Sequence, residues 1–294
     1  MKERQKRNNV IIYKKKEEPS CGAVFFNYGN SAILRLFVAL ISMRKVYKGD
    51  ITLMFPTDDI WYKDLIKDIS QMGLNINFEW FELLDVRRKI KSSIKPKLFS
   101  LSPYDKTIMF DGDILVKKPF DKLFDELDKN GFLITQFSTW TTHKRTMVKR
   151  IKRMSEFLSE EDLSKSLDRQ PAINIGVMGY KKGLGDELLN DWEKLTHKMR
   201  GKFLGDEIAI QGTFFKHPCS VVPSIYNYSC KLESTPLEDA VIIHYHGHKH
   251  ARGDRKTSRM WWEEAKTLDK DIFEKWIQYD KYALRNREQF ENDL

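Results

Sequence analysis

The chain has 294 residues, of which 41% are hydrophobic and 32% are charged, and its formal net charge is +9. A chain of this length and composition buries one substantial core, which excludes an intrinsically disordered protein. No apolar run approaches the roughly 20 residues that a helix needs to cross a bilayer, which excludes a helical membrane protein. One enlarged globular domain with terminal extensions is the expected organisation.

The amino terminus and the cysteines indicate where the protein works. The basic amino terminus contains no apolar stretch long enough for a secretory signal peptide. Three cysteines, Cys21, Cys219 and Cys230, lie far apart in the sequence, unlike those of a disulfide framework or a zinc ribbon. The sequence therefore predicts a cytoplasmic protein with reduced thiols.

Positive charge is concentrated in three segments. Residues 1–18 hold seven Lys or Arg and three Glu, and two basic clusters follow later in the chain. The clusters consist of Arg87, Arg88, Lys89, Lys91, Lys95 and Lys97, and of Lys144, Arg145, Lys149, Arg150, Lys152 and Arg153. Such a surface attracts nucleic acid, phospholipid or a phosphorylated small molecule, and charge alone does not choose among these partners. A solvated basic face is the preferred interpretation of the second cluster.

Strands and helices alternate along the chain. Apolar runs and helical spacing predict strands over 22–27, 51–55, 76–84, 107–110, 132–137, 172–180 and 241–246, and helices over 31–41, 62–72, 119–130, 147–167, 186–197, 207–215 and 257–294. This order is typical of a layered α/β domain in which helices cover a largely parallel sheet.

Two aspartates, Asp111 and Asp113, directly follow the strand over 107–110 and are separated by one glycine. Like charges at the end of a buried strand are costly unless a metal ion or another cation neutralises them. Mn²⁺ and Mg²⁺ prefer carboxylate oxygens and often complete their shell with phosphate oxygens of a substrate. Gly112 lets the backbone turn close to such a ligand. A tight turn rich in Asp and Gly is the alternative, but ligands of open α/β sheets bind at the carboxyl ends of strands.

The acidic pair belongs to a longer pattern. The segment from Ser102 to Phe124 resembles the metal-binding region of family 8 glycosyltransferases, which include glycogenin and lipopolysaccharide galactosyltransferases. Three later segments follow in that family's order: Asn174-Ile-Gly-Val, Gly205-Asp206-Glu207 and His244-Tyr-His-Gly247-His-Lys249. The similarity extends over residues 20–250. It implies the GT-A fold, a Rossmann-like mixed sheet flanked by helices, here with a helical C-terminal extension.

The resemblance also implies roles for single residues. Asp111, Asp113 and His244 would bind Mn²⁺ or Mg²⁺, and Asn174 and Asp206 would act at the reacting sugar. The implied contacts to the nucleotide-sugar donor are Asn27, Lys97, Asp111, Gly112, Gly247 and Lys249. The chain departs from the family's pattern at three points: Lys249 stands one residue early, Glu207 replaces a glutamine, and Asn27-Tyr28 replaces an acidic pair.

Several of these residues have simpler interpretations. His244 follows three apolar residues and would also suit a core histidine, and His246 is the alternative metal ligand on the opposite strand face. The alternating histidines from His244 to His250 are less typical of a zinc site, because no cysteine lies near them. Asn174 would also suit a turn at the end of a strand. Asp206 would also cap the helix that begins near Glu207, and Lys97 would also suit solvent.

The expected protein is a metal-dependent glycosyltransferase that moves a sugar from a nucleotide-diphosphate donor to a hydroxyl acceptor. The resemblance implies a UDP-hexose, retention of configuration, and a glycan, lipid or protein acceptor. The expected organisation is a flexible tail at 1–18, the GT-A catalytic domain at 19–250, and a helical extension at 251–294 that packs on it. Nucleic acid is not an expected partner, and the sequence does not indicate the oligomeric state.

Two alternatives stay open. The first is a nucleic-acid-binding or membrane-surface protein that uses the basic clusters, which leave a peripheral membrane contact open for the enzyme too. The second is a nucleotidyltransferase, which also uses paired aspartates. That class needs a glycine-rich basic loop after the first strand, which residues 25–30 do not supply convincingly.

Overall fold

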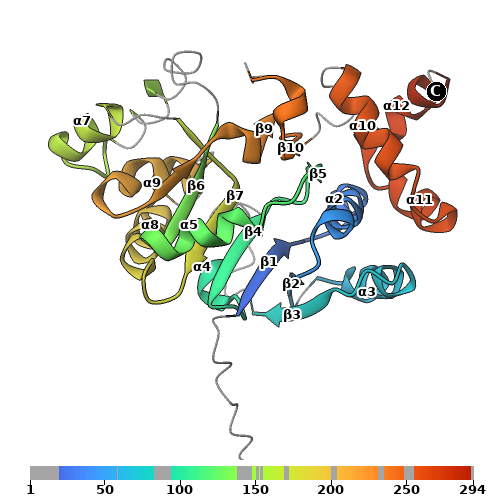
Figure 1. Cartoon of the computed structure of the whole chain (residues 1–294), viewed down its shortest axis with the longest axis horizontal. Helices are drawn as coiled ribbons and strands as arrows, with labels where there is room; N and C mark the ends of the chain where they lie inside the picture. Colours follow the sequence, from blue (N-terminus) through green and yellow to red (C-terminus); the bar gives the residue numbers. More distant parts are fainter. Residues whose placement is uncertain are drawn as a thin grey trace, which may run out of the picture.

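Seven strands form one mixed sheet at the centre of the molecule (Figure 1). The computed structural model describes residues 20–57, 59–82, 94–137, 148–149, 152, 155–168, 172–199, 204–230, 235–247 and 255–292. The strands are β1 (Cys21–Phe26), β2 (Asp50–Pro56), β3 (Asn77–Phe81), β4 (Lys106–Phe110), β6 (Phe132–Gln136), β7 (Ile173–Lys181) and β8 (Ser220–Val222), in the order β3-β2-β1-β4-β7-β6-β8. The first four of this order are parallel, and β7 runs antiparallel to both of its neighbours. The predicted α/β architecture is confirmed.

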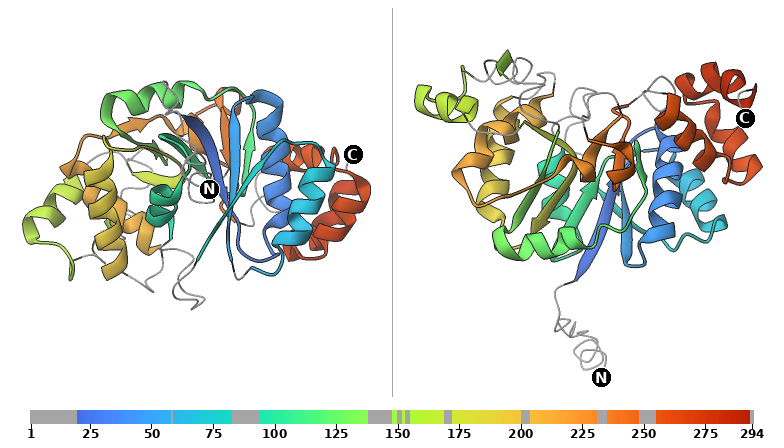
Figure 2. Two further views of the ribbon diagram at one scale, coloured as in Figure 1. Left: turned by 90° about the horizontal axis from the view of Figure 1, so that it is seen from below. Right: turned by 45° about the horizontal axis from the view of Figure 1, so that its top comes forward.

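Helices cover both faces of this sheet, as its edge-on view in Figure 2 shows. Strand β1 explains why both faces need cover, because Ala23 and Phe25 point into one apolar core and Val24 points into the other. The first core is closed by α2 (Ile33–Val46), α3 (Tyr62–Gln71) and α5 (Lys122–Asn130). The second is closed by α4 (Lys95–Leu101), α8 (Asp186–Lys198) and α9 (Gly205–Thr213).

The helix predicted over 147–167 is wrong as a continuous element. Residues 155–158 form turns and a bend, and α7 (Glu160–Asp168) begins only after them. Ser159 explains this start, because its hydroxyl accepts the backbone N–H of Asp162 at 3.1 Å.

A second, three-stranded sheet corrects the expectation for the last strand. It contains β5 (Ile114–Val116), β9 (Tyr228–Ser229) and β10 (Ile242–His244), in the order β5-β10-β9. The strand predicted over 241–246 therefore ends at His244 and does not join the large sheet. It pairs antiparallel with β5, which places His244 opposite Ile114 and next to Asp113.

Three C-terminal helices lie beside α2 (Figure 1): α10 (Arg255–Ala265), α11 (Lys270–Ile277) and α12 (Lys281–Asn292). The tryptophans that they carry, Trp261, Trp262 and Trp276, are buried in the same apolar core as α2. Within the described ranges, no helix is both long and apolar enough to cross a bilayer.

We expect Trp276→Ala to lower the free energy of unfolding by about 3–5 kcal/mol, the usual cost of truncating a buried tryptophan. Its ring is fully buried against Phe37 and Trp61, and its indole N–H donates to Asp68 at 2.6 Å. Urea unfolding measures the change. Leu284→Ala on α12 is the control, because Leu284 is 41% exposed and should change the unfolding free energy little. Equal effects of the two substitutions would contradict the prediction.

Candidate active site

Polar side chains gather where β1 and β4 end. Asn27 follows β1 and Asp111 follows β4, so both lie at the carboxyl edge of the parallel half of the sheet, where open α/β sheets bind ligands. The backbone N–H of Asp111 donates to the carbonyl of Gly176 at 2.9 Å. Gly176 lies in an irregularity of β7, where pairing with β6 jumps from Met178 to Asn174. Such bulges re-aim side chains beside functional sites.

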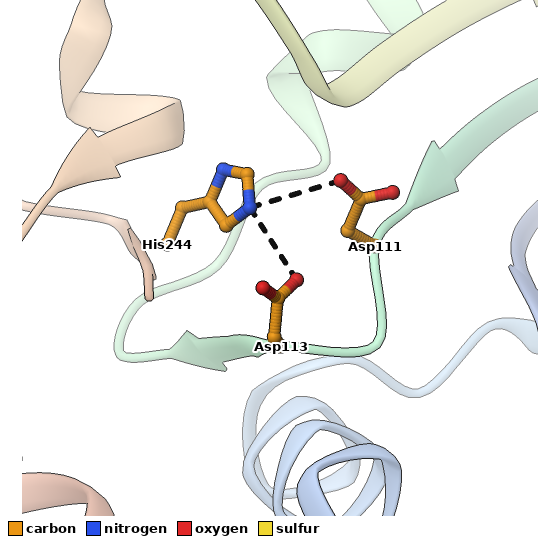
Figure 3. Close-up of side chains that lie close together, drawn as sticks. All are labelled: Asp111, Asp113 and His244. Atoms are coloured by element: carbon orange, nitrogen blue, oxygen red, sulfur yellow. Dashed lines mark ion pairs between the residues drawn. The ribbon is translucent and has the colours of Figure 1, made fainter. Parts of the chain in front are cut away.

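Asp111, Asp113 and His244 converge on one point (Figure 3). The Nε2 atom of His244 lies 3.7 Å from Oδ2 of Asp111 and 3.3 Å from Oδ1 of Asp113. One ligand atom from each residue lies within 4.8 Å of the others. The imidazole is buried, whereas the two carboxylates are partly exposed. The three residues predicted to bind metal are therefore together, and their oxygen and imidazole ligands suit a divalent cation.

A hydrogen-bond chain fixes which nitrogen of His244 carries a proton. The backbone N–H of Gly176 donates to Oδ1 of Asn174, which identifies that atom as the amide oxygen. Asn227, in the 3₁₀ helix η3 (Ser224–Asn227), lies 2.8 Å from this oxygen and must donate to it through Nδ2. The Oδ1 atom of Asn227 therefore faces Nδ1 of His244 at 2.9 Å and accepts its proton. In the neutral imidazole, Nε2 is left with a lone pair that faces two carboxylates, as a metal ligand requires.

The charges at this point also call for a cation. Burial lowers the pKa of His244, but the carboxylates of Asp113 and Asp111 together outweigh burial, and the pKa of His244 is raised. Burial raises the pKa of Asp113, but His244, the charge of Arg35 and the backbone N–H of Gly247 together outweigh burial, and the pKa of Asp113 is lowered. A proton on the imidazole or a metal ion among the three side chains satisfies both groups.

The alternative histidine, His246, lies beside His244, with the two ring centroids 4.0 Å apart, but its Nε2 atom has another partner. The Nε2 atom of His246 pairs with the hydroxyl of Ser229 at 2.9 Å, and its backbone has a positive φ of 49°. The geometry thus places His244, and not His246, against the aspartates. Two other histidines of the alternating set, His248 and His250, lie outside the described residues.

The basic side chain beside the aspartates is Lys95. Its Nζ atom lies 2.7 Å from Oδ1 of Asp111 and donates to the carbonyl of Ile175 at 2.8 Å. Lys97, the residue chosen from the sequence, is exposed on α4, two residues away. Two positions on a helix differ by about 200° around its axis, so only one of these lysines turns toward the sheet edge.

The residues predicted to act at the sugar, Asn174 and Asp206, lie on β7 and α9. Asn174 is buried, and its Nδ2 donates to Oε2 of Glu207 at 2.8 Å. Helix α9 begins at Gly205, so Asp206 lies inside its first turn and is not the N-cap residue, which is Leu204. The capping interpretation of Asp206 is therefore wrong. Burial raises the pKa of Asp206 to about 7, although the charge of Lys95 opposes this shift.

The remaining predicted residues differ in how the fold uses them. Asn27 is buried and donates from Nδ2 to the carbonyl of Gly29 at 3.0 Å. Gly247 has a positive φ of 81°, a conformation that favours glycine, and its N–H donates to Asp113. A side chain at Gly112 would meet only Leu36, at an ordinary 3.7 Å, so packing does not demand a glycine there. Lys249 lies outside the described residues.

Sequence reasoning missed three residues of this site. Lys95 was counted only as part of a basic cluster, and Thr135 and Asn227 had no assigned role. Gly176 belonged to the Asn174-Ile-Gly-Val motif, but its closeness to His244 was not predicted. Asn227 is fully buried, and Nδ2 also donates to the hydroxyl of Thr135 at 2.8 Å. A methyl group at Gly176 would lie 2.4 Å from the ring of His244. No local signal reveals these contacts, because each joins segments far apart in the chain.

Comparisons with known proteins agree with the fold. No family model matches the sequence, and no curated protein matches it by sequence. The galactosyltransferase LgtC, solved with donor and acceptor sugar analogs, has a TM-score of 0.57 and 16% identity, over 84% of this chain and 96% of that one. The bifunctional glycosyltransferase WbbM has a TM-score of 0.61 and 12% sequence identity, over 88% of this chain and 52% of that one. The glycosyltransferase GlyE of Streptococcus pneumoniae has a TM-score of 0.56 and 18% sequence identity, over 89% of this chain and 64% of that one.

These likenesses establish a fold and not an activity. The chain spans nearly all of LgtC but only about half of WbbM and less than two thirds of GlyE. The seven-stranded mixed sheet flanked by helices is the GT-A fold of glycosyltransferases, which confirms the fold implied by the sequence motifs.

We expect Gly176→Ala to weaken Mn²⁺ binding at least about tenfold, since displacing an oriented ligand has effects of this size. The added methyl group would collide with His244, whose ring Asn227 holds in place. Isothermal titration with Mn²⁺ measures the effect. Gly179→Ala is the matched control on the same strand, because its methyl group would crowd Ile108 and Leu127 instead. It should lower stability and leave Mn²⁺ affinity unchanged, and equal losses of affinity would contradict the prediction.

The raised pKa of Asp206 predicts a pH-dependent stability. Between pH 4 and pH 7 the folded protein holds a proton on Asp206 that the unfolded chain releases, so stability falls as pH rises through this range. The total loss is up to about 4 kcal/mol. Asp206→Asn removes this loss. The unfolding free energy of the variant minus that of the wild type should therefore increase from pH 5 to pH 7 and stay constant above pH 8. Urea unfolding across this range tests the prediction, and a pH-independent difference would contradict it.

Proposed function

We propose that this protein is a metal-dependent glycosyltransferase that transfers a hexose from a UDP-sugar to a hydroxyl acceptor. One observation carries the proposal: Asp111, Asp113 and His244 converge at the carboxyl edge of a GT-A sheet, although His244 comes from a separate small sheet. The carboxyl edge of such a sheet is where a nucleotide binds. A glycan, lipid or protein acceptor and a cytoplasmic location belong to the same proposal.

Asp111, Asp113 and His244 would hold Mn²⁺ or Mg²⁺. In the neutral imidazole, the lone pair of Nε2 faces two carboxylates, and a divalent cation among them would accept all three ligands. When bound, the metal would supply positive charge for the diphosphate that leaves the sugar. Asn227 would keep the imidazole in the required tautomer through its contact with Nδ1.

Lys95 would orient Asp111 and add positive charge beside the donor. Its ammonium group contacts both Asp111 and the carbonyl of Ile175, and these two contacts fix its position. A preorganised charge stabilises a developing negative charge without reorganising when the bond breaks. This role replaces the one expected for Lys97.

Asn174, Asp206 and Glu207 would face the sugar. Their carboxylate and amide oxygens suit the positive charge that develops at the anomeric carbon as the nucleotide leaves. Asn174 is held at both ends, by Glu207 and by Asn227, so its position does not depend on the sugar. Asn27, Gly112, Gly247 and Lys249 are the proposed donor contacts that follow from the motif resemblance, as does retention of configuration.

We expect the wild-type protein to bind UDP only with Mn²⁺ present and to release UDP from a UDP-hexose. Asp111→Asn with Asp113→Asn should abolish this turnover while circular dichroism stays unchanged. His244→Ala should weaken Mn²⁺ binding at least about tenfold, because a ligand is lost. Calorimetry with UDP and Mn²⁺, and an assay of UDP release, measure these effects.

His246→Ala is the comparison variant, because the Nε2 atom of His246 pairs with the hydroxyl of Ser229 while its ring packs beside that of His244. It should change Mn²⁺ affinity much less than His244→Ala does. Thermal shifts with UDP-, GDP- and dTDP-sugars test the donor, because a ligand that binds only the folded state raises stability. Full turnover by the double aspartate variant in the presence of a chelator would refute the function, and Mn²⁺-dependent protection by a GDP-sugar alone would refute the UDP donor.

A further inference from the structure

One arginine of α2 joins three segments that are far apart in the sequence. Arg35 donates from Nη1 to the carbonyl of Gly247 at 2.7 Å and from Nη2 to the carbonyl of Ser31 at 2.8 Å. Its Nε lies 3.1 Å from Oδ2 of Asp280, an ion pair whose alignment is not that of a hydrogen bond. Asp280 directly precedes α12. A planar guanidinium reaches these three partners from three separate nitrogens in a fixed plane, whereas the donors of an ammonium group all lie on one nitrogen.

Two of these contacts hold the segments on either side of the proposed donor site. Ser31 follows Asn27, at the end of β1, and Gly247 follows His244, at the end of β10. The N–H of Gly247 in turn donates to Asp113, a proposed metal ligand. Gly247 has a positive φ, a conformation that glycine adopts readily, so its backbone has more conformational freedom than that of other residues. The hydrogen bond from Arg35 to its carbonyl restricts that freedom.

The third contact ties this arginine to the C-terminal helices. The side chain of Asp280 is 1% exposed and that of Arg35 is 14% exposed. A charge buried to this extent needs its partner, since leaving either charge alone is strongly unfavourable. Oδ1 of Asp280 accepts the backbone N–H groups of Tyr282 and Ala283 at 3.1 Å, so the same carboxylate caps α12 and orients Arg35.

We propose that Arg35 is a positioning residue for the donor site, and that the C-terminal helices belong to this site because Asp280 holds Arg35 in place. The inference rests on the proposed function only where it is tested by UDP binding. In this arrangement the helical extension does more than cover apolar surface. It fixes the backbone after β1 and after β10, between which a nucleotide diphosphate would lie.

Asp280→Asn tests this coupling without removing the cap of α12, because asparagine caps a helix as well as aspartate does. Arg35→Lys keeps a charge but loses the fork that reaches both carbonyls. Each variant should bind UDP with saturating Mn²⁺ about 3- to 30-fold more weakly than the wild type, a range measured for residues that modulate binding from outside the ligand's contacts. The double variant should lose little more than Arg35→Lys alone, since both changes break one chain of contacts.

Asp68→Asn is the matched control. Asp68 is also buried and also pairs with the C-terminal helices, through Lys275 at 2.9 Å and the indole of Trp276, but it contacts neither donor segment. It should lower the unfolding temperature and leave the affinity for UDP with Mn²⁺ unchanged. An equal loss of affinity in Asp68→Asn would mean that the extension acts by general stability, and the proposal would be overturned.

Hydrogen exchange separates this inference from the proposed function. Amides of residues 28–32 and 245–247 should exchange faster in Asp280→Asn than in the wild type and at the wild-type rate in Asp68→Asn. If the wild type does not bind UDP with Mn²⁺, the proposed function fails, and the exchange rates still decide the role of Arg35. Unchanged exchange in both segments of Asp280→Asn and Arg35→Lys would overturn the inference.

Discussion

The structure around the site depends on the electrostatic problem set by two aspartates that share the end of one strand. Asp111 and Asp113 are close in sequence, partly buried and of like charge, and such a pair is stable only beside positive charge or metal. Lys95 pairs with Asp111, and His244 pairs with Asp113. The neighbouring polar groups are arranged so that these two partners keep their places.

Asn227 is central to that arrangement because its one buried amide contacts two of the predicted site residues, His244 and Asn174. Its oxygen holds the imidazole of His244, and its nitrogen holds Asn174 and Thr135. The proposed metal side and the proposed sugar side therefore share one rigid element, anchored by the backbone N–H of Gly176. A fully satisfied buried network of this kind specifies one geometry, whereas a broken one leaves costly unpaired groups.

The same logic extends to the end of the chain. Apolar packing of Trp261, Trp262 and Trp276 joins the C-terminal helices to α2, and the buried pair of Arg35 and Asp280 adds direction to that contact. Apolar burial contributes most of the free energy but has little orientational preference. The ion pair contributes little net stability by comparison, yet it defines where the guanidinium points.

The sequence alone determined the α/β class, most strands and helices, and the position of the acidic pair, because these depend on local periodicity and on the short segment around residues 107–116. It also identified His244, through a motif, but placed it at the end of a strand of the main sheet. Tertiary structure decided that β10 pairs with β5 in a separate sheet and that Lys95 and not Lys97 reaches Asp111. It also decided that Asn227 and Gly176 lie against His244 and that Arg35 reaches Gly247. The physical reason is that a buried hydrogen bond or a close packing contact has no periodicity along the chain. It is fixed only when segments as far apart as Arg35 and Asp280 pack against one another.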